Sequence, residues 1–171
     1  MYLIVDGYNV IGNWPELMSL AEEDFAAARD YLKDTLASHC GYTGEQLVLV
    51  FDAHQTRRTE TTEEIFVGKG RHKRPVGRVV YTRKGETADN YIERFVRQNA
   101  GETMTVVSGD RLVQVLTFAY ASRMSARELQ LEVRKTAKLM EEHATNRKKK
   151  FALETRLGGE TYVALDEWRR E

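Results

Sequence analysis

Three short apolar runs, each followed closely by an acidic residue, set the pattern of the chain. They occupy residues 2–5, 46–51 and 104–107. Their apolar residues are continuous rather than alternating with polar ones, which is typical of strands buried on both faces of a parallel sheet. The pattern therefore predicts a central, mostly parallel sheet.

Segments with helical spacing separate these runs. Residues 24–40 and 87–99 each place apolar side chains three and four positions apart, which gives each predicted helix one apolar face. Gly41 is a candidate stop for the first helix, and the strongly apolar residues 111–121 predict a buried helix. Strands that alternate with helices predict an α/β fold, with a sheet flanked by helices and right-handed crossovers.

The stretch from residue 55 to residue 77 has a different character, because it is rich in Thr, Arg, Lys and Gly. Residues 65–67 and 78–82 predict two further strands that flank a basic loop at 68–77.

A long helix is expected to begin near residue 125. Ser125 and Glu128 have the spacing of a capping box. The residues expected on its core face are Leu129, Val133, Ala137 and Met140. We expect this helix and the tail, residues 125–171, to pack on a single domain that spans residues 1–171.

Length and composition fit that architecture. A chain of 171 residues can form one domain with a full core, and 42% hydrophobic with 30% charged residues is typical of a globular protein. No apolar run reaches the ~20 residues that span a bilayer, and one cysteine, Cys40, suits a reducing compartment. We expect a cytoplasmic protein with no membrane segment.

Charge is distributed unevenly, although the formal net charge is zero. Between residues 53 and 85 there are nine Lys or Arg against three Glu, a local charge of +6. Basic clusters attract phosphate backbones. Arg71, Lys73 and Arg74 are therefore candidate RNA contacts, on an arm that we expect near the acidic strand ends.

Acidic residues follow the predicted strands at their carboxyl ends. Asp6, Asp52 and Asp110 stand at or just beyond the three apolar runs, and Glu86 and Asp89 follow the next predicted strand. Parallel strands deliver their carboxyl ends to one edge of a sheet, so we expect these carboxylates to meet there. Clustered carboxylates repel one another unless a cation neutralises them, and oxygen ligands favour Mg²⁺ or Mn²⁺.

Each acid also has a simpler interpretation. Asp6 and Asp52 can begin turns, Asp110 can cap the next helix, and Glu86 and Asp89 suit a helix N-terminus. An acid after every strand is harder to attribute to capping alone. A divalent metal bound by such acids can activate water and stabilise a displacement at phosphorus.

Three neighbours of the acids are candidates for supporting roles. Asn9 can orient Asp6 or a ligand water. His54 follows Asp52 closely enough to contact RNA, and Tyr8 can stack on unpaired bases. Trp14 has the same capacity as Tyr8, and packing is the alternative for both rings.

Rival chemistries lack their residues. The glycines at 68 and 70 have neither the length nor the Ser/Thr of a phosphate-binding loop, the four histidines lack a zinc spacing, and Ser108-Gly109 lacks a nucleophile elbow. Metal-assisted phosphodiester chemistry is what the acids fit.

Four motifs resemble those of a known family. They are D-G-Y-N-V-I at 6–11, V-F-D-A-H at 50–54, E-T-A-D at 86–89 and S-A-R-E-L at 125–129. In this order and spacing they resemble the bacterial YacP-like NYN-domain ribonucleases. The resemblance implies a three-layer PIN-like α/β fold, Mg²⁺-dependent endoribonuclease activity and a role in ribosome-associated mRNA decay. By position, it makes Asp6 and Asp89 the foremost catalytic candidates, then Asp52 and Asp110, with Asn9 and Glu86 supporting.

Functions of different kinds stay open at this point. The leading hypothesis is a metal-dependent endoribonuclease that cleaves single-stranded RNA, with mRNA on the ribosome as its expected target. The alternative is a non-catalytic RNA- or ribosome-binding module whose acids are structural. A metal-dependent phosphatase or DNA nuclease is a third hypothesis, which a substrate panel separates from the first.

Overall fold

The computed structural model describes residues 1–52, 59–68, 70–109 and 120–168, with residues 150–168 described by their backbone alone. The elements in chain order are β1 (Tyr2–Asp6), α1 (Gly7–Ile11), α2 (Pro15–Glu23), α3 (Phe25–Thr43), β2 (Gln46–Phe51), β3 (Thr61–Val67), the 3₁₀ turn η1 (Gly70–His72), β4 (Arg74–Tyr81), α4 (Ala88–Gln98), β5 (Met104–Val107), β6 (Ser122–Met124) and α6 (Ala126–Trp168).

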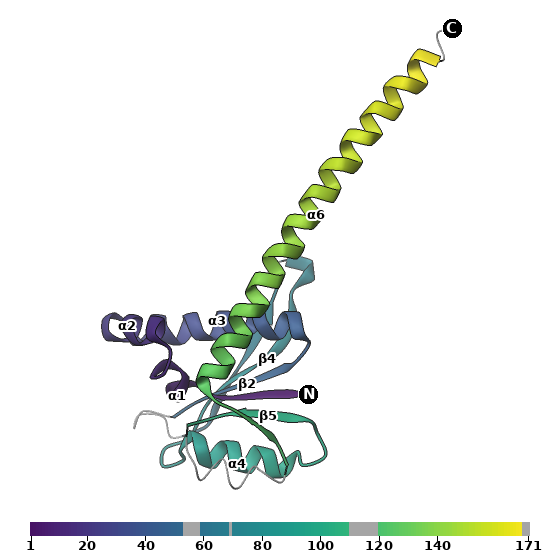
Figure 1. Ribbon diagram of the computed structural model, residues 1–171. Coiled ribbons are helices and arrows are strands. Elements are labelled where there is room, and N and C mark those ends of the chain that lie inside the picture. Colours follow the sequence, from purple (N-terminus) through teal and green to yellow (C-terminus); the bar gives the residue numbers. More distant parts are fainter. Residues whose placement is uncertain (53–58, 69, 110–119, 169–171) are drawn as a thin grey trace. The chain divides into compact units, whose positions relative to one another are not determined.

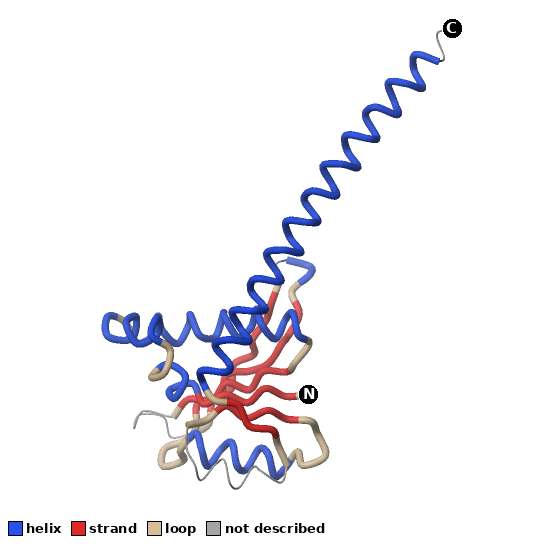
Figure 2. The backbone as a smooth tube through the Cα atoms, viewed as in Figure 1, coloured by secondary structure: helices blue, strands red, loops and turns tan. Residues whose placement is uncertain are grey.

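Six strands form one sheet in the order β3-β4-β2-β1-β5-β6 (Figure 2). All neighbouring pairs are parallel except β3 and β4, which are antiparallel. From β1 the chain builds outward through β2 to β4, then crosses to β5 on the other side of β1. The strand order therefore reverses between β1 and β5, and open α/β sheets bind their ligands at the carboxyl end of such a reversal.

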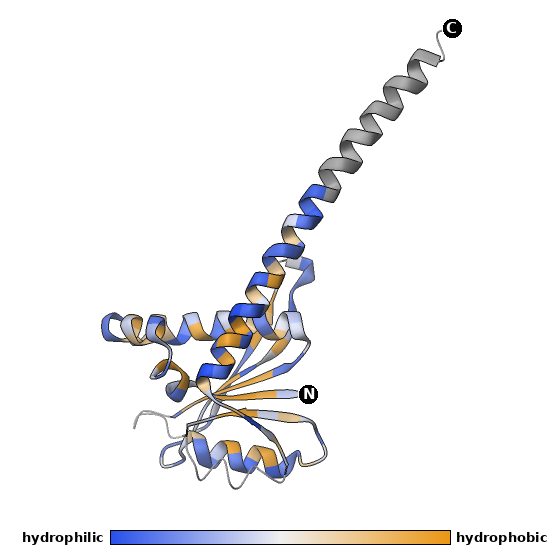
Figure 3. Cartoon of the chain, in the orientation of Figure 1, coloured by the Kyte–Doolittle hydropathy of each residue, from blue (hydrophilic) through white to orange (hydrophobic). Residues whose placement is uncertain are grey.

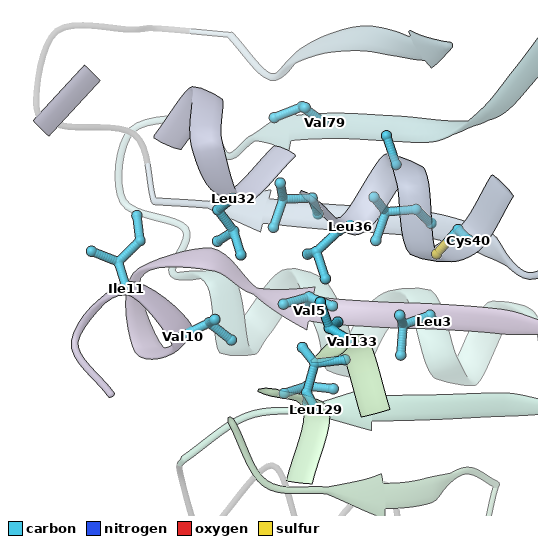
Figure 4. Close-up of a cluster of buried hydrophobic side chains, with 14 of the residues drawn as sticks. Leu3, Val5, Val10, Ile11, Leu32, Leu36, Cys40, Val79, Leu129 and Val133 are labelled. Atoms are coloured by element: carbon cyan, nitrogen blue, oxygen red, sulfur yellow. The ribbon is translucent and has the colours of Figure 1, made fainter. Parts of the chain in front are cut away.

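Alternate residues of the strands supply two cores, one on each face of the sheet. Leu3 and Val5 pack with Leu32 and Leu36 of α3 (Figure 4). Ile4, between them in sequence, packs on the opposite face with Ile92 and other residues of α4. Helices thus cover both faces, and strands dominated by apolar residues lie between them (Figures 1 and 3). The predicted three-layer α/β fold is confirmed.

Helix boundaries follow from capping groups. Asp24 accepts hydrogen bonds from the backbone N–H groups of Ala26 and Ala27, at 2.8 and 3.1 Å, and so begins α3. The helix continues through Gly41 and ends at Gly44, whose φ of +82° is the left-handed conformation typical of a helix stop. The prediction that Gly41 ends this helix is wrong, because the stop is three residues later.

The predicted start of the long helix is confirmed. The N–H of Ser125 donates to Glu128 Oε2 at 2.7 Å, and the N–H of Glu128 donates to Ser125 Oγ at 3.2 Å, which completes the capping box. Leu129 and Val133 are buried, as expected, whereas Ala137 and Met140 are exposed, so the prediction that these two lie on the core face is wrong. The Trp14 indole N–H donates to the carbonyl of Ala126 at 2.7 Å. These contacts attach the first turns of α6 to the sheet.

The chain divides into two compact units, Met1–Arg134 and Lys135–Glu171. The first contains the sheet, α1 to α4 and the first turns of α6. The second holds the rest of α6, as far as the structure describes it. The packing of residues 125–171 on one domain stays a prediction for the part beyond Arg134. Within the described residues, no helix combines the length and the apolar character needed to cross a membrane.

Candidate active site at the carboxyl edge of the sheet

Three of the predicted acids meet at the carboxyl edge of the sheet. Asp6 is the last residue of β1, and Asp52 directly follows β2. Asp89 lies in the first turn of α4, which follows β4. Asp52 and Asp89 both act electrostatically on Asp6. Strand direction places them together, since β2 lies between β1 and β4 and is parallel to both.

The electrostatic state of Asp6 reflects this crowding. Burial, followed by the negative charges of Asp89 and Asp52, raises its pKa from the ordinary value of 3.8 to about 6, against the opposing effect of a hydrogen bond from the Asn9 N–H. A carboxylate in this position is costly to ionise, and a nearby cation relieves that cost.

Asp6 and Asp52 also cap helices. Asp6 Oδ1 accepts from the Asn9 N–H at 3.1 Å at the start of α1, and Asp52 Oδ1 accepts from the Ala88 N–H at the start of α4. The simpler interpretation of these two residues was a turn start. The structure shows instead that Asp6 caps α1 and that Asp52 accepts from a helix N–H 36 residues further along the chain. Capping does not exclude metal binding, because a carboxylate has two oxygens and about four lone-pair sites.

Ser108 and Gly109, which follow β5, complete the edge where the strand order reverses. Ser108 Oγ lies 3.3 Å from Asp89 Oδ1, and the serine is only 2% exposed. A Cβ atom on Gly109 would lie 2.1 Å from Asn9 Nδ2, so the Asn9 amide rests directly against the glycine. The sequence analysis missed both roles. The available signal was their position directly after the apolar run at 104–107.

Glu86 is held apart from the other acids. Its side chain is 8% exposed and forms ion pairs with Arg94, at 2.9 Å, and with Arg83, at 3.2 Å. Arg94 also contacts Glu60 at 3.0 Å. The guanidinium groups neutralise Glu86. Its metal-binding role stays a prediction, and a metal ion would have to compete with the two arginines for this carboxylate.

Of the two aromatic candidates, Tyr8 is half-buried against other rings and Trp14 is fully buried. Tyr8 lies 5.5 Å from the ring of Phe25 and 5.1 Å from that of Phe51, measured between centroids. Trp14 is 1% exposed, which leaves no free face for a base. Base contact by Tyr8 stays a prediction, and Trp14 is a core residue. His54 and Asp110 lie outside the described residues.

The basic arm lies at the wrong edge for the role that the sequence suggested. Arg71 and Lys73 precede β4, and Arg74 is its first residue, whereas the other end of the strand, Tyr81, pairs with Phe51 beside Asp52. A rise of about 3.3 Å per residue separates the two ends of β4 by about 23 Å. The expectation that this arm lies near the acids is wrong. Two other exposed basic residues, Arg83 and Lys84, come just after the carboxyl end of β4; the sequence analysis had not singled them out.

The donor set suits Mg²⁺ bound with outside ligands rather than in a closed cage. Among the described residues, no group of three His, Cys, Asp or Glu side chains is arranged to hold a metal ion alone. Mg²⁺ is commonly held by one or two carboxylates, with waters and substrate phosphates in its other positions. Asp6 and Asp89, with Asp52 beside them, offer oxygen donors of this kind, and the raised pKa of Asp6 marks the charge that a cation would neutralise.

Known proteins resemble this chain over its whole length. The model of the YacP-like NYN domain matches residues 3–170. The protein of Bacillus subtilis (strain 168) described as "Uncharacterized protein YacP" is 34% identical over 172 residues, covering 98% of this chain and 96% of the relative. The crystal structure of Rae1 (YacP) from Bacillus subtilis superposes with a TM-score of 0.69 at 32% identity, over 100% of this chain and 95% of that one. A mutant of the same protein gives a TM-score of 0.65 at 36% identity, over 83% and 80% of the two chains.

These matches confirm the resemblance that the four motifs suggested, and they agree with the six-stranded α/β architecture. The chain is homologous to Rae1 along its length. It belongs to the family of proteins with a YacP-like NYN domain.

Proposed function

We propose that this protein is a metal-dependent endoribonuclease that cleaves single-stranded RNA. The observation that carries the proposal is the meeting of Asp6, Asp52 and Asp89 where the strand order reverses, with the pKa of Asp6 raised to about 6. Membership of an NYN-domain family supports it, since NYN domains are typically nuclease domains.

Mg²⁺ or Mn²⁺, when bound, supplies an activated water and stabilises charge on a phosphate. In this proposal Asp6 and Asp89 hold the ion, and Asp52 and Asp110 complete the acidic surroundings. The Asn9 N–H fixes the orientation of Asp6, and Ser108 Oγ fixes that of Asp89.

Substrate approach in this proposal depends on the exposed positive charges of the same edge. Arg83 and Lys84 lie two and three residues beyond the end of β4 and are exposed. They can attract the phosphate backbone of RNA without reading its sequence. Tyr8 and His54 are proposed as further RNA contacts.

The similarity to Rae1 extends the proposal to the setting of the reaction. We propose mRNA as the substrate, the translating ribosome as the partner and the cytoplasm as the location. Each of these rests on resemblance to the family rather than on a contact within this chain.

A second candidate function is a non-catalytic RNA- or ribosome-binding module with the same fold. The hydrogen bonds that Asp6 and Asp52 accept from helix N–H groups favour this candidate, because they give both acids a structural role without any ligand. In that case RNA binding survives substitution of the acids, and neither the wild type nor any variant cleaves RNA.

Cleavage assays separate the two candidates. Asp6→Asn and Asp89→Asn keep the size of each side chain and remove its charge, and Asp30→Asn is the matched control on the exposed surface of α3, where Asp30 is ion-paired with Lys33 at 2.6 Å. We expect cleavage of a single-stranded RNA to require Mg²⁺ or Mn²⁺ and to fall at least about 100-fold in the first two variants. The control should cleave as the wild type does.

The same assay is run on free RNA, on DNA and on RNA engaged by translating ribosomes, with circular dichroism to verify folding. Undiminished cleavage in both acid variants contradicts the proposal. Preference for DNA over RNA contradicts the choice of substrate only.

A further inference from the structure

The turn between β3 and β4 forms a basic surface at the amino edge of the sheet. Arg71, Lys73 and Arg74 occupy three of four consecutive positions, and all three are exposed. Within the part of the chain that the structure describes, neither Arg71 nor Lys73 is ion-paired with a carboxylate. We call Phe66, Arg71, Lys73 and Arg74 the hairpin surface.

The hairpin surface is held in place by α3. The guanidinium of Arg74 donates to the carbonyl of Gly41, and the glycine lies so close to Val67 of β3 that an added Cβ would be 3.0 Å from Val67 Cγ1. A turn fixed in this way loses little conformational freedom when it binds a partner. Its positive charges are therefore presented on a rigid support.

The contact between Lys73 and Phe66 indicates what the surface can recognise. Lys73 Nζ lies 4.4 Å from the centroid of the Phe66 ring, and Phe66 is 39% exposed. The ammonium group covers one face of the ring, which disfavours stacking of a base there. Positive charge, rather than an open aromatic platform, faces solvent, so the surface suits phosphate groups and carries no means of reading bases.

The hairpin surface and the acids cannot easily share one short strand of RNA. They lie at opposite ends of β4, about 23 Å apart at about 3.3 Å per residue. The antiparallel neighbour β3 runs between the same two edges and exposes Glu63 and Glu64, whose negative charges repel a phosphate backbone. A strand that enters the acidic site is therefore not guided along β3 to the hairpin.

We propose that the hairpin surface is a separate docking site for the phosphate backbone of a folded RNA, distinct from the strand cleaved at the carboxyl edge. The proposed function enters this inference only in making RNA the polyanion. Docking of this kind is independent of sequence, depends strongly on salt and positions the protein rather than its reaction centre.

Binding in the absence of divalent metal tests the docking site directly. The probe is an RNA stem-loop with a stem of about 16 base pairs, the span that shape-specific RNA binders contact. Arg71→Gln/Lys73→Gln should bind it at least about tenfold more weakly at moderate salt, and the slope of log K against log salt should fall by about two. Two stems of unrelated sequence should behave alike.

Two controls separate local charge from net charge and from folding. Lys33→Gln/Arg97→Gln removes two positive charges from α3 and α4 and should change the affinity less than about twofold, as expected for solvent-screened surface charges. Arg71→Lys/Lys73→Arg keeps both charges and should retain the affinity and most of the salt slope. Arg74 is left intact because it anchors the turn to Gly41.

Failure of the docking site and failure of the proposed nuclease give different results. Cleavage of a single strand of about eight nucleotides, within the site size of single-strand binders, should be equal in the wild type and in Arg71→Gln/Lys73→Gln. If neither protein cleaves RNA, whether free or engaged by translating ribosomes, but the double variant loses the stem-loop, the nuclease proposal fails and the docking site stands.

Three results overturn the docking site. They are unchanged stem-loop affinity in the double variant, equal weakening in the Lys33/Arg97 control, and a stem-loop that the wild type does not bind. The last result would point to an acidic protein surface as the occupant instead.

Discussion

The two edges of the sheet carry opposite charges in opposite physical situations. At the carboxyl edge Asp6, Asp52 and Asp89 are partly buried, accept hydrogen bonds from the chain and act on one another. At the amino edge Arg71 and Lys73 are exposed to solvent. Partly buried charges are weakly screened, so the acids affect stability and chemistry. Exposed charges are screened by salt, so the basic residues affect binding at long range.

In a parallel sheet, residues that are close in sequence can lie at opposite edges, so only some of them are close to a given site. Residues 71–74 and residues 83–84 belong to one basic stretch of the sequence. The eight-residue strand β4 begins at the end of the first group and finishes before the second, and its two ends lie at different edges of the sheet. Strand direction, rather than local charge, decides which basic residues accompany the acids.

Asp6 offers the largest effect with which to test this contrast. Its folded-state pKa of about 6 lies above the ordinary 3.8, so the folded protein binds more protons than the unfolded chain between these values, and the free energy of unfolding falls as pH rises through that window. Asp6→Asn removes the ionisation and keeps a good helix cap. We expect it to be more stable than the wild type by about 2–3 kcal/mol at pH 7.5 and equal to it near pH 3.5.

Urea unfolding at several pH values measures this difference. Asp30→Asn, on the exposed side of α3, should show no such pH-dependent gain. Addition of Mg²⁺ should stabilise the wild type more than Asp6→Asn, because a bound cation offsets the repulsion only where the charge exists. A destabilised Asp6→Asn at pH 7.5 would contradict the account of Asp6 as a costly carboxylate.

The fold was predictable because its signals are local. Continuous apolar runs and the three-and-four spacing of helix residues do not depend on which elements become neighbours. The edge shared by the acids was predictable for the same reason, since every parallel strand delivers its carboxyl end to one side. The misplacement of Gly41 as a helix stop shows the limit, because a nearby Gly44 offered the same signal.

The error about the basic arm was avoidable from the sequence itself. The strand before Glu86 and Asp89 was expected to end at the acidic edge, which requires the loop before that strand to lie at the other edge. For Ser108 and Gly109 only the position at the acidic edge could be predicted in this way; the contacts that give them and Arg94 their roles could not. Each role depends on a contact between side chains that only the folded chain brings together: Ser108 with Asp89, Gly109 with Asn9, and Arg94 with Glu60.

Arg94 tests whether the carboxyl edge depends on buried charge pairs. Arg94→Gln leaves the nearly buried Glu86 with Arg83 as its remaining ion-pair partner among the described residues, and we expect a loss of about 1–2 kcal/mol in the free energy of unfolding. Arg97→Gln on the same helix breaks an exposed pair with Glu93 and should cost about 0.3–0.5 kcal/mol. Equal losses in the two variants, measured by urea unfolding, would mean that Glu86 behaves as a surface residue.

Gly109 gives the smallest effect on stability and the finest test of the acidic edge. Alanine there places a Cβ atom 2.1 Å from Asn9 Nδ2, so the Asn9 amide must move. The amide is the far end of a side chain, and Gly109 has no positive φ that alanine would strain, so unfolding should change by less than about 0.5 kcal/mol. If Asn9 orients the site, RNA cleavage should fall about tenfold, as small displacements near a reaction centre do.

Gly101→Ala is the matched control, because a Cβ atom there meets nothing within 4 Å. A double-mutant cycle with Asn9→Ala then assigns the effect: if Gly109 acts through Asn9, the two losses of cleavage are not additive. Additive losses would mean that the glycine matters through Ser108 and Asp89 instead. Full activity in Gly109→Ala would mean that the segment after β5, where the strand order reverses, does not contribute to cleavage. The acids of β1, β2 and α4 would then act without it.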